Sequence, residues 1–423
     1  MSTDRMLVIG AGPSGLAVSK AFAEAGIDHE VAEATDHVGG NWAHGVYRSA
    51  HIISSRRTTE YADYPMPADW PDFPSAAQMC AYYEDYAMRF GIRERIRFGA
   101  DVVSVRPAEA GWDVGFGDGA TARYKGVAIC NGHHWAKEFP AWVQHWRGEL
   151  LHSKDYRHPD QLRGKRVLVL GGGNSGCDIV SEAARVSAVA DWSLRRGYWF
   201  LPKTMLGRPS IELMSGYVPV AAQRLVLKGL VRIIVGDYRR YGLPLPDHDL
   251  FDHHPTLSTE IFHYLKHGRI RPRQDVVKAE NNRVFFSDGS DSEYDLVVCA
   301  TGFSVSLPML APGTVPVIGK CPQLVAGGMT REHRHLYVVG AYQARYGIGP
   351  LIRPLAVLLA GWVVLQDELA TPLGEILYRM GIRPPSSHLV DPHAALRQMR
   401  WAQRWMPVLR MRAIRMDGRA KAA

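Results

Sequence analysis

The chain carries the same order of hydrophobic and polar positions twice. Four apolar residues, Met6–Ile9, precede a glycine turn and a run of helix-forming residues that starts at Pro13. Residues 166–170 (RVLVL), apolar after the first, likewise precede a second glycine turn and another helix-forming run. A short apolar run, a tight turn and a helical pattern predict a strand, a turn and a helix. The sequence therefore predicts an α/β fold built on two Rossmann-like units.

Other periodic segments surround these two blocks. Apolar runs predict further strands at 29–33, 102–105, 127–130, 190–194, 283–286, 295–303 and 335–340. Helical spacing predicts helices over 76–90 and 351–365, whereas the proline-rich residues 61–74 are expected to be extended. Residues 204–265 mix helical patches with loops and give no finer prediction.

The first glycine turn has the spacing of a dinucleotide site. Gly10 permits the sharp turn, Gly12 lets the backbone approach a pyrophosphate, and Gly15 lets the helix pack closely on the strand. Pro13 and Ser14 open the helix, whose N-terminus favours phosphate groups. We therefore expect these five residues to contact a cofactor.

The end of the next predicted strand indicates which cofactor this is. That strand ends in Glu33, which is an acceptor for a ribose 2′-hydroxyl and would repel a 2′-phosphate. The first site should therefore hold FAD or NAD and not NADP. The loop that follows contains Gly40, Asn41 and Trp42, and its position lets it reach back over a flavin.

The second glycine turn differs from the first at the corresponding place. Its candidate cofactor contacts are Gly171, Gly173, Asn174, Ser175 and Gly176. The strand that follows ends in Arg195 and Arg196, with Lys203 beyond them, where the first unit has an acid. Guanidinium groups there suit the 2′-phosphate of NADPH, although a solvated basic turn is an alternative.

Composition narrows the class of protein. A chain of 423 residues with 46% hydrophobic and 22% charged residues is typical of a soluble protein of two or three domains. Its five cysteines are widely spaced and form no C-x-x-C pair, which argues for reduced thiols and against a disulfide reductase. No signal peptide precedes the first strand, and the apolar run 354–365 is too short to span a bilayer. We therefore expect a cytoplasmic protein in which that run forms a buried helix.

Charge is concentrated at the C-terminal end. The whole chain has a net charge of +8, of which residues 397–423 carry +7. The remaining body is nearly neutral, so the composition gives no argument for nucleic-acid binding. Residues 396–416 are predicted to form an amphipathic helix interrupted near Pro407. It would dock on its own body or on a second subunit of a homodimer, or bind an anionic membrane surface.

Two groups of histidines raise the question of a metal site. His133 and His134 are adjacent, but no third ligand stands at metal spacing. The residues 247–249 and 252–254 are rich in Asp and His, but they belong to one polar loop whose side chains would have to converge. We therefore predict no metal.

Four segments resemble the flavin-containing monooxygenases, the class B flavoprotein family related to the Baeyer–Villiger monooxygenases. They are 146–157 (WRGELLHSKDYR), which matches the family's F-x-G-x-x-x-H-x-x-x-(Y/F) fingerprint with tryptophan for phenylalanine, and 130–134 (CNGHH), 173–178 (GNSGCD) and 300–303 (ATGF). The resemblance implies a discontinuous FAD domain, residues 1–157 and 297–395, with an NADPH domain, 158–296, inserted into it. Residues 204–265 would shape the substrate pocket, and 396–423 would form a basic tail.

The resemblance also implies a reaction and further cofactor contacts. NADPH would reduce FAD, oxygen would add at flavin C4a, and the resulting hydroperoxide would oxygenate an amine nitrogen or a sulfide of a small organic substrate. No catalytic triad is needed, because the cofactor carries the chemistry. The implied further contacts are Val102, Gly132, Thr301, Gly302 and Gln343. Baeyer–Villiger oxidation of a ketone, an NADPH oxidase that releases hydrogen peroxide, and a nucleotide-sensing regulator remain alternatives.

One position departs from the family pattern. Ile53 stands where the family carries an asparagine beside flavin C4a and the nicotinamide. Isoleucine cannot make the hydrogen bonds of an amide, so Ser54 or His51 would have to replace them. Otherwise, the oxygenated flavin is supported less well.

Overall fold

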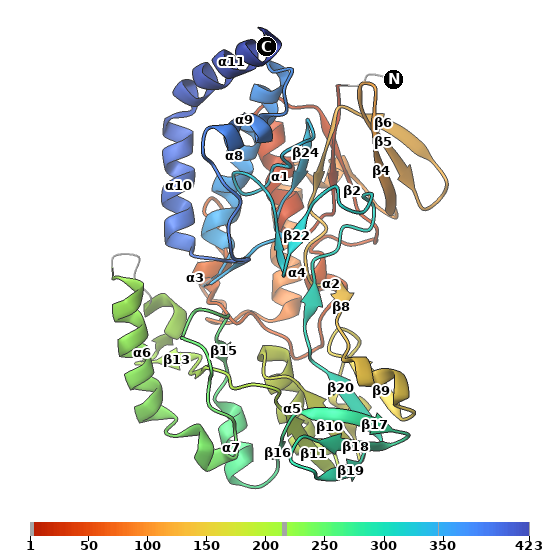
Figure 1. Cartoon of the computed structure of the whole chain (residues 1–423), viewed down its shortest axis with the longest axis vertical. Coiled ribbons are helices and arrows are strands. Elements are labelled where there is room, and N and C mark those ends of the chain that lie inside the picture. The colour runs from red at the N-terminus through yellow and green to blue at the C-terminus, as the bar shows by residue number, and fades with distance from the viewer. Residues whose placement is uncertain (1–3, 214–217, 346, 423) are drawn as a thin grey trace. The chain divides into compact units, whose positions relative to one another are not determined.

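Two parallel five-stranded sheets organise the chain (Figure 1). The computed structural model describes residues 4–213, 218–345 and 347–422. They form a first unit of Met1–His44, Arg56–Trp135 and Val305–Ala423, and a second unit of Gly45–Ser55 and Ala136–Ser304. The predicted fold class, two Rossmann-like units in an α/β chain, is confirmed.

The sheet of the first unit has the order β24-β7-β1-β2-β3, with β1 at its centre. The pairs are parallel, and Val8 of β1 lies beside Val31 of β2 and Ala128 of β7. The strands are β1 (Met6–Ile9), β2 (His29–Ala32), β3 (Ile96–Arg97), β7 (Gly126–Ile129) and β24 (Leu336–Val338). The helices are α1 (Pro13–Glu24), α2 (Asn41–His44), α3 (Arg56–Thr59), α4 (Ala76–Arg89), α8 (Gly349–Asp367), α9 (Leu373–Arg379), α10 (Pro392–Arg404) and α11 (Met406–Ala422).

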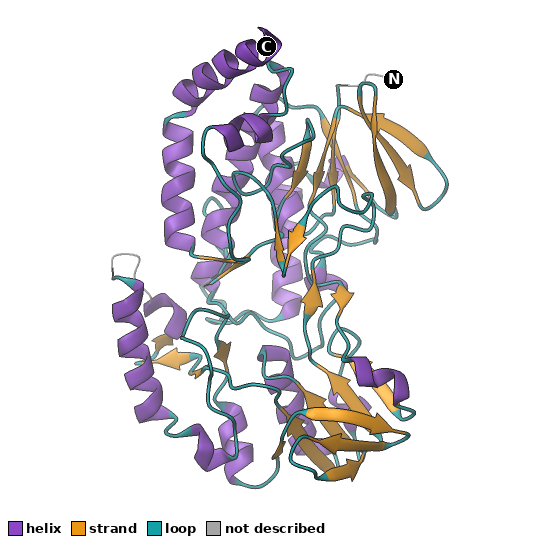
Figure 2. Ribbon diagram, viewed as in Figure 1, coloured by secondary structure: helices purple, strands orange, loops and turns teal. Residues whose placement is uncertain are grey.

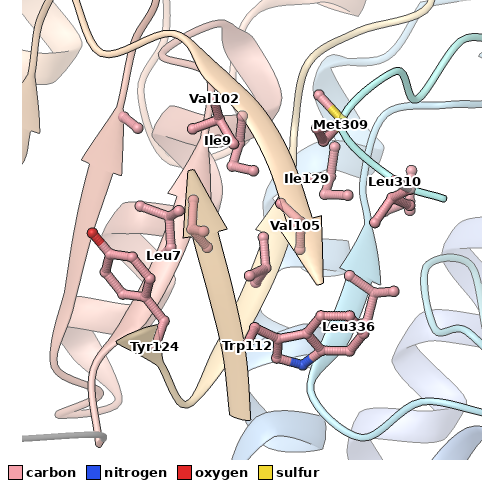
Figure 3. Close-up of a cluster of buried hydrophobic side chains, with 14 of the residues drawn as sticks. Leu7, Ile9, Val102, Val105, Trp112, Tyr124, Ile129, Met309, Leu310 and Leu336 are labelled. Atoms are coloured by element: carbon pink, nitrogen blue, oxygen red, sulfur yellow. The ribbon is translucent and has the colours of Figure 1, made fainter. Parts of the chain in front are cut away.

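An antiparallel sheet, β4 (Val102–Ala108), β5 (Gly111–Phe116) and β6 (Thr121–Tyr124), covers part of the hydrophobic core of this unit. Figure 3 shows its side chains beside Leu7 and Ile9 of β1. Trp112 is buried there and donates its indole N–H to the carbonyl of Arg334 at 3.1 Å. The apolar alternation of these strands therefore serves packing.

The apolar helix predicted over 351–365 is α8, which is longer than the apolar run itself. By length and composition it could cross a membrane, but 61% of its most apolar window is buried inside the protein. It packs against α1 and α10. A core helix can have the same length and composition as a membrane span, so burial is the deciding observation. It confirms the prediction of a buried helix.

The basic tail forms α10 and α11, which separate at Trp405, as the interruption near Pro407 predicted. Leu409 and Ala413 are buried, while Trp401, Trp405, Met411 and Ile414 are exposed. The buried Asp417 carboxylate accepts hydrogen bonds from the backbone N–H groups of Ala370 (3.1 Å) and Thr371 (2.8 Å). The tail thus docks on its own unit and leaves a face of tryptophan and arginine exposed.

The sheet of the second unit has the order β16-β11-β10-β20-β9 and is also parallel (Figure 2). Its strands are β9 (Glu149–His152), β10 (Arg166–Leu170), β11 (Val189–Ser193), β16 (Arg271–Arg273) and β20 (Leu296–Cys299), and its helices are α5 (Asn174–Val186), α6 (Val220–Ile234) and α7 (Glu260–Lys266). A separate antiparallel sheet contains β17 (Val276–Glu280), β18 (Arg283–Phe286) and β19 (Asp291–Glu293).

The two units divide the chain differently from the boundaries expected from the sequence. Those boundaries, 157/158 and 296/297, both fall inside the second unit. The reason is that β9 pairs with β20 in one sheet, with Leu150 beside Val297, so both strands belong to the same unit. Residues 45–55 also belong to the second unit, although they lie within 1–157, which was expected to be part of the FAD domain.

Candidate functional site

Two of the three glycines in the first turn are required by the protein's own packing. Gly10 has a φ of +100°, and a Cβ there would approach the Cys130 carbonyl oxygen to 2.9 Å. A Cβ at Gly15 would come within 1.8 Å of the Gly10 carbonyl oxygen. A Cβ at Gly12 would meet only Gly40 Cα, at an ordinary 3.7 Å. The absence of a side chain at Gly12 therefore has no explanation in the protein's packing.

Glu33 lies against this turn. Its carboxylate accepts a hydrogen bond from the backbone N–H of Ala11 at 2.7 Å and two from Thr35, at 2.8 and 2.9 Å. The side chain is buried, so these bonds hold it in place. Each carboxylate oxygen can accept more than one bond, which leaves capacity for a ribose hydroxyl.

The loop 39–42 lies on the other side of the turn. The N–H of Gly39 donates to the Ala11 carbonyl at 3.0 Å, and Gly40 has a φ of +58° and faces Gly12. Asn41 and Trp42 begin α2 directly after it. The structure therefore brings this loop to the glycine turn, as the sequence position suggested.

Loops that follow β7 and β24 meet at the carboxyl edge of the same sheet. Gly132 follows β7 with a φ of +74°, and Gln343 begins a short strand, β25 (Gln343–Ala344), just after β24. The Nδ1 of His133 lies 2.9 Å from the Gly340 carbonyl oxygen and joins the two loops. Val102, by contrast, places its side chain in the hydrophobic core (Figure 3).

In the second turn, too, packing requires the first and third motif glycines but not the second. A Cβ at Gly171, where φ is +102°, would lie 2.4 Å from the Ala300 carbonyl oxygen, and one at Gly176 would lie 2.2 Å from the Gly171 carbonyl oxygen. A Cβ at Gly173 would have no neighbour within 4 Å. Asn174 accepts a hydrogen bond from the backbone of Leu257 at 2.9 Å. A Cβ at the second motif glycine of either turn, Gly12 or Gly173, would thus clash with no protein atom.

The three predicted cations of the second unit have different surroundings. Arg195 is exposed, and no carboxylate of the described residues lies within ion-pair distance of it. Arg196 approaches His253 Nε2 at 3.1 Å and lies over the ring of Tyr198. Lys203 donates to His51 Nε2 at 2.6 Å. The side chains of Arg196 and Lys203 thus already have partners within the second unit.

The segment 45–55, which carries Ile53 and Ser54, is attached to α5. The Tyr47 hydroxyl donates to Asp178 at 2.7 Å, and Ser49 donates to Glu182 at 2.5 Å. Desolvation by burial raises the pKa of Tyr47 well above its usual value. Ser175, one of the predicted contacts, also hydrogen-bonds the Tyr47 hydroxyl. Ile53 and Ser54 are half-buried at the end of this anchored segment.

His51 has both ring nitrogens engaged. Lys203 can only donate, so Nε2 of His51 accepts, and Nδ1–H then donates to the Ser49 carbonyl at 3.2 Å. This argues against His51 as the group that replaces the family's asparagine amide.

The fingerprint residues of 146–157 serve the fold of the second unit. The Trp146 indole donates to the Glu149 carbonyl at 3.1 Å, and the Tyr156 hydroxyl donates to Glu182. His152 donates from Nε2 to the Gly302 carbonyl at 3.1 Å, and burial lowers the pKa of its ring. Thr301 donates to the Glu138 carbonyl at 2.5 Å. The local contacts of Thr301 and Gly302 are thus to protein groups.

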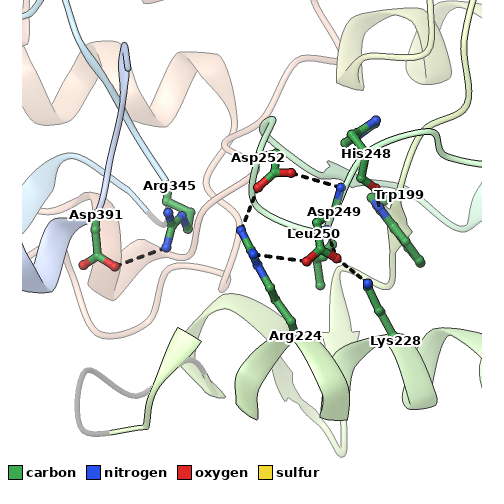
Figure 4. Close-up of polar contacts among 9 residues, drawn as sticks. All are labelled: Trp199, Arg224, Lys228, His248, Asp249, Leu250, Asp252, Arg345 and Asp391. Atoms are coloured by element: carbon green, nitrogen blue, oxygen red, sulfur yellow. Dashed lines mark hydrogen bonds and ion pairs between the residues drawn. The ribbon is translucent and has the colours of Figure 1, made fainter. Parts of the chain in front are cut away.

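The loop 247–254 uses its acids in ion pairs (Figure 4). Arg224 of α6 contacts Asp249 at 3.1 Å and Asp252 at 2.7 Å, and Lys228 also pairs with Asp249.

A different group in the described part of the chain, Asp36, His37 and His44, has ligand atoms within 4.8 Å of one another. All three side chains are exposed, and Asp36 already bonds His37, which accounts for the low pKa of that carboxyl.

Several contacts at these sites escaped the sequence analysis. The ring of Tyr198 lies against Gly172, where a Cβ would come within 2.5 Å of it, and the carboxylates of Asp178 and Glu182 stand one helical turn apart under segment 45–55. The bond between His133 and Gly340 is a further such contact, and the adjacent histidines at 133 and 134 suggested only a metal site. Nothing in the local sequence indicated the other contacts.

Comparison with known proteins gives a consistent result. A family described as "FMO-like: Flavin-binding monooxygenase-like" matches residues 3–325. Human flavin-containing monooxygenase 5 is 32% identical over 341 residues, which are 73% of this chain and 64% of that protein. Dimethylaniline monooxygenase [N-oxide-forming] 2 of Macaca mulatta is 27% identical over 396 residues, 85% of this chain and 72% of that protein.

A solved structure shares the fold. Oxidised steroid monooxygenase bound to NADP superposes with a TM-score of 0.70 at 18% identity and covers 94% of this chain and 97% of its own. This chain spans about two-thirds of the length of the human relative. The family match, residues 3–325, includes both glycine turns.

Proposed function

Because the chain belongs to the flavin-binding monooxygenase-like family, we propose that it is an FAD enzyme that uses NADPH and O2 to oxygenate a small organic substrate. The proposed site of oxygenation is an amine nitrogen or a sulfide sulfur. A relative whose name specifies N-oxide formation supports the nitrogen chemistry. Baeyer–Villiger oxidation of a ketone is the second candidate, supported by the fold shared with a steroid monooxygenase.

The observation that carries the proposal is the free second glycine of each turn. Packing explains Gly10, Gly15, Gly171 and Gly176, but neither Gly12 nor Gly173. A ligand whose pyrophosphate approaches the backbone at these two points explains both. The residues present therefore fit two dinucleotides.

The two strand ends support a different dinucleotide at each turn. The buried Glu33 carboxylate beside the first turn suits the adenosine ribose of FAD and disfavours a 2′-phosphate. The exposed Arg195 after β11, which has no ion-pair partner among the described residues, suits the 2′-phosphate of NADPH. We accordingly place FAD on the first unit and NADPH on the second.

Bound FAD, once reduced by NADPH, would supply the oxygen activation at C4a that the family resemblance implies. The chain's own residues would hold and orient the cofactors and exclude water. We assign Ile53 and Ser54 to the surroundings of the flavin C4a and the nicotinamide. Isoleucine excludes water but donates no hydrogen bond, so we expect part of the reducing equivalents to leave as hydrogen peroxide.

The substrate pocket is proposed within 204–265. In this region α6 pairs Arg224 with the loop 247–254, and its Leu225 and Ile233 are exposed. An exposed apolar helix face next to a charge-fixed loop is consistent with binding an apolar substrate body.

The exposed face of the tail is proposed to contact anionic membranes. Trp401 and Trp405 are exposed beside a segment with a strong excess of arginine. Vesicles with and without phosphatidylserine should be compared for wild type and for the double variant Trp401→Gln, Trp405→Gln. Equal binding of both proteins to anionic vesicles, or no binding by wild type, rejects this contact.

One experiment tests the enzyme proposal as a whole. Purified protein should be yellow, should bleach when NADPH is added without oxygen, and should recover its colour in air. Product analysis with a tertiary amine, a thioether and a cyclic ketone then separates the reactions. Protein that binds no flavin, or flavin that NADPH does not reduce, contradicts the proposal.

A further inference from the structure

His133 occupies a fixed orientation at the carboxyl edge of the first sheet. Its Nδ1 lies 2.9 Å from the carbonyl oxygen of Gly340. A carbonyl oxygen can only accept, so Nδ1 carries the hydrogen and donates. Burial lowers the pKa of His133, which favours the neutral ring. In the neutral ring Nε2 is then an acceptor without a hydrogen.

This Nε2 is buried and has no hydrogen-bond partner among the residues that the structure describes. A buried acceptor without a donor is costly, and such groups in folded proteins usually have a partner. The bond to Gly340 rules out a simple ring flip as the remedy, because it would exchange one unpaired nitrogen for the other. The missing partner is therefore a donor that the chain itself does not supply.

The surroundings of Gly340 place this acceptor at the proposed flavin site. A Cβ at Gly340 would come within 2.3 Å of Ser14 Oγ, so Gly340 lies directly against the start of α1. His133 follows β7, Gly340 follows β24 and Ser14 follows β1. Ligands of open α/β sheets bind at the carboxyl ends of the strands, where these three residues meet.

The sheet order indicates which part of FAD reaches His133. The order is β24-β7-β1-β2, so Glu33 after β2 and His133 after β7 lie on opposite sides of the glycine turn after β1. With the adenosine at Glu33 and the pyrophosphate at Gly12, the chain of FAD continues toward β7. The pyrophosphate oxygens only accept, whereas the ribityl chain that follows carries hydroxyl donors.

We propose that Nε2 of His133 accepts a hydrogen bond from a ribityl hydroxyl of FAD, which makes His133 a cofactor-positioning residue. The proposal rests on the assignment of FAD to the first unit. It differs from a purely structural role, in which His133 would only brace Gly340. The two roles use different ring nitrogens, so two substitutions separate them.

His133→Asn places an amide N–H near the position of Nδ1 and removes the acceptor at Nε2. His133→Gln reaches the position of Nε2 with an amide oxygen and gives up the donor to Gly340. We expect FAD to dissociate from the full-length His133→Asn holoenzyme about five- to tenfold faster than from wild type, and from His133→Gln within about twofold of wild type. The readout is the rise of flavin fluorescence after dilution.

The matched control is His134→Asn, since the ring of His134 lies 4.1 Å from that of His133, centroid to centroid, but is exposed. It should leave FAD release unchanged. Thermal unfolding in saturating FAD should stay near the wild-type temperature for all three variants and shows that each is folded.

Faster release from His133→Gln than from His133→Asn overturns the proposal, because bracing of Gly340 would then be the role. Equal release from both variants, whether slow or fast, overturns it too, because the acceptor would have no separate effect. Failure of the cofactor assignment itself gives a different result. Gly12→Ala would then keep its flavin, and neither histidine variant would change the rate of FAD release.

Discussion

The two glycine turns share their backbone geometry, but the charged residue that follows the next strand differs between them. In one unit this side chain is fixed before a ligand binds, and in the other it is not. Glu33 is buried and already held by Ala11 and Thr35, so binding a ribose there orders nothing new. Arg195 is exposed and has no ion-pair partner among the described residues, so a phosphate must order a long side chain. The first site is therefore suited to a tightly held prosthetic group, and the second to a cosubstrate that leaves in every cycle.

The largest expected effect comes from a methyl group at the second glycine of each turn. Gly12→Ala should purify largely without flavin, whereas Gly173→Ala should keep its flavin and raise the KM for NADPH roughly a hundredfold, because the methyl group fills the space of the pyrophosphate. Flavin content per chain and steady-state kinetics measure the two losses. Both variants should fold, since a Cβ meets only Gly40 Cα at 3.7 Å in the first and nothing within 4 Å in the second. If both variants lost the same cofactor, the assignment of different cofactors to the two turns would be wrong.

Arg195→Ala should lower the ratio of kcat/KM for NADPH to that for NADH roughly ten- to hundredfold, because it removes a charge-assisted contact to the 2′-phosphate. Arg196→Ala and Lys203→Ala are the controls and should change this ratio less, since these cations already contact His253 and His51. A ratio that falls most in the Lys203 variant would place the phosphate elsewhere.

Ile53→Asn should reduce the hydrogen peroxide released per NADPH and lengthen the life of the oxygenated flavin by about fivefold or more, since an amide adds a hydrogen bond that isoleucine lacks. Stopped-flow absorbance of the reduced enzyme mixed with oxygen measures the lifetime, and a peroxidase-coupled assay measures the peroxide. A long-lived species in wild type that the asparagine does not prolong would show that Ser54 or NADP+ already supplies the contact.

The smallest effect expected is on stability. Tyr47→Phe should lower the free energy of unfolding by about 1–2 kcal/mol, because the partly buried Asp178 carboxylate loses a hydrogen-bond donor. Tyr64→Phe, which removes an exposed bond to Asp85 in the first unit, should cost less. Denaturant titration followed by tryptophan fluorescence compares them, and an equal or reversed order would contradict the anchoring of segment 45–55.

Local pattern was sufficient for the strand, glycine turn and helix that begin each nucleotide-binding unit, but not for the helices of 204–265. Met6–Ile9 and 167–170 are apolar runs directly followed by glycine turns, and the charge at the end of the following strand can be read without a structure. The same holds for the inward face of the tail, where Leu409 and Ala413 recur at helical spacing. The type of such an element and its buried face depend on residues that are close together in the sequence.

The parts that could not be predicted depend on residues far apart in the sequence. Tyr47 and Asp178 are 131 positions apart, and His51 and Lys203 are 152 apart, so no window of sequence contains either pair. For this reason the placement of segment 45–55 and the local role of Lys203 escaped the analysis. The role of His133 escaped it for a related reason, since its partner, Gly340, is 207 positions away.

The membership of residues 45–55 in the second unit has a consequence for exchanging parts between relatives. The chain passes from one unit to the other at 44/45, 55/56, 135/136 and 304/305, so the second unit is not a contiguous cassette. A chimera that transplants only residues 136–304 brings Asp178 and Glu182 without their own Tyr47 and Ser49. Grafts that carry the eleven residues 45–55 together with the larger segment keep both carboxylates paired, and they are the ones that should fold and retain their coenzyme preference.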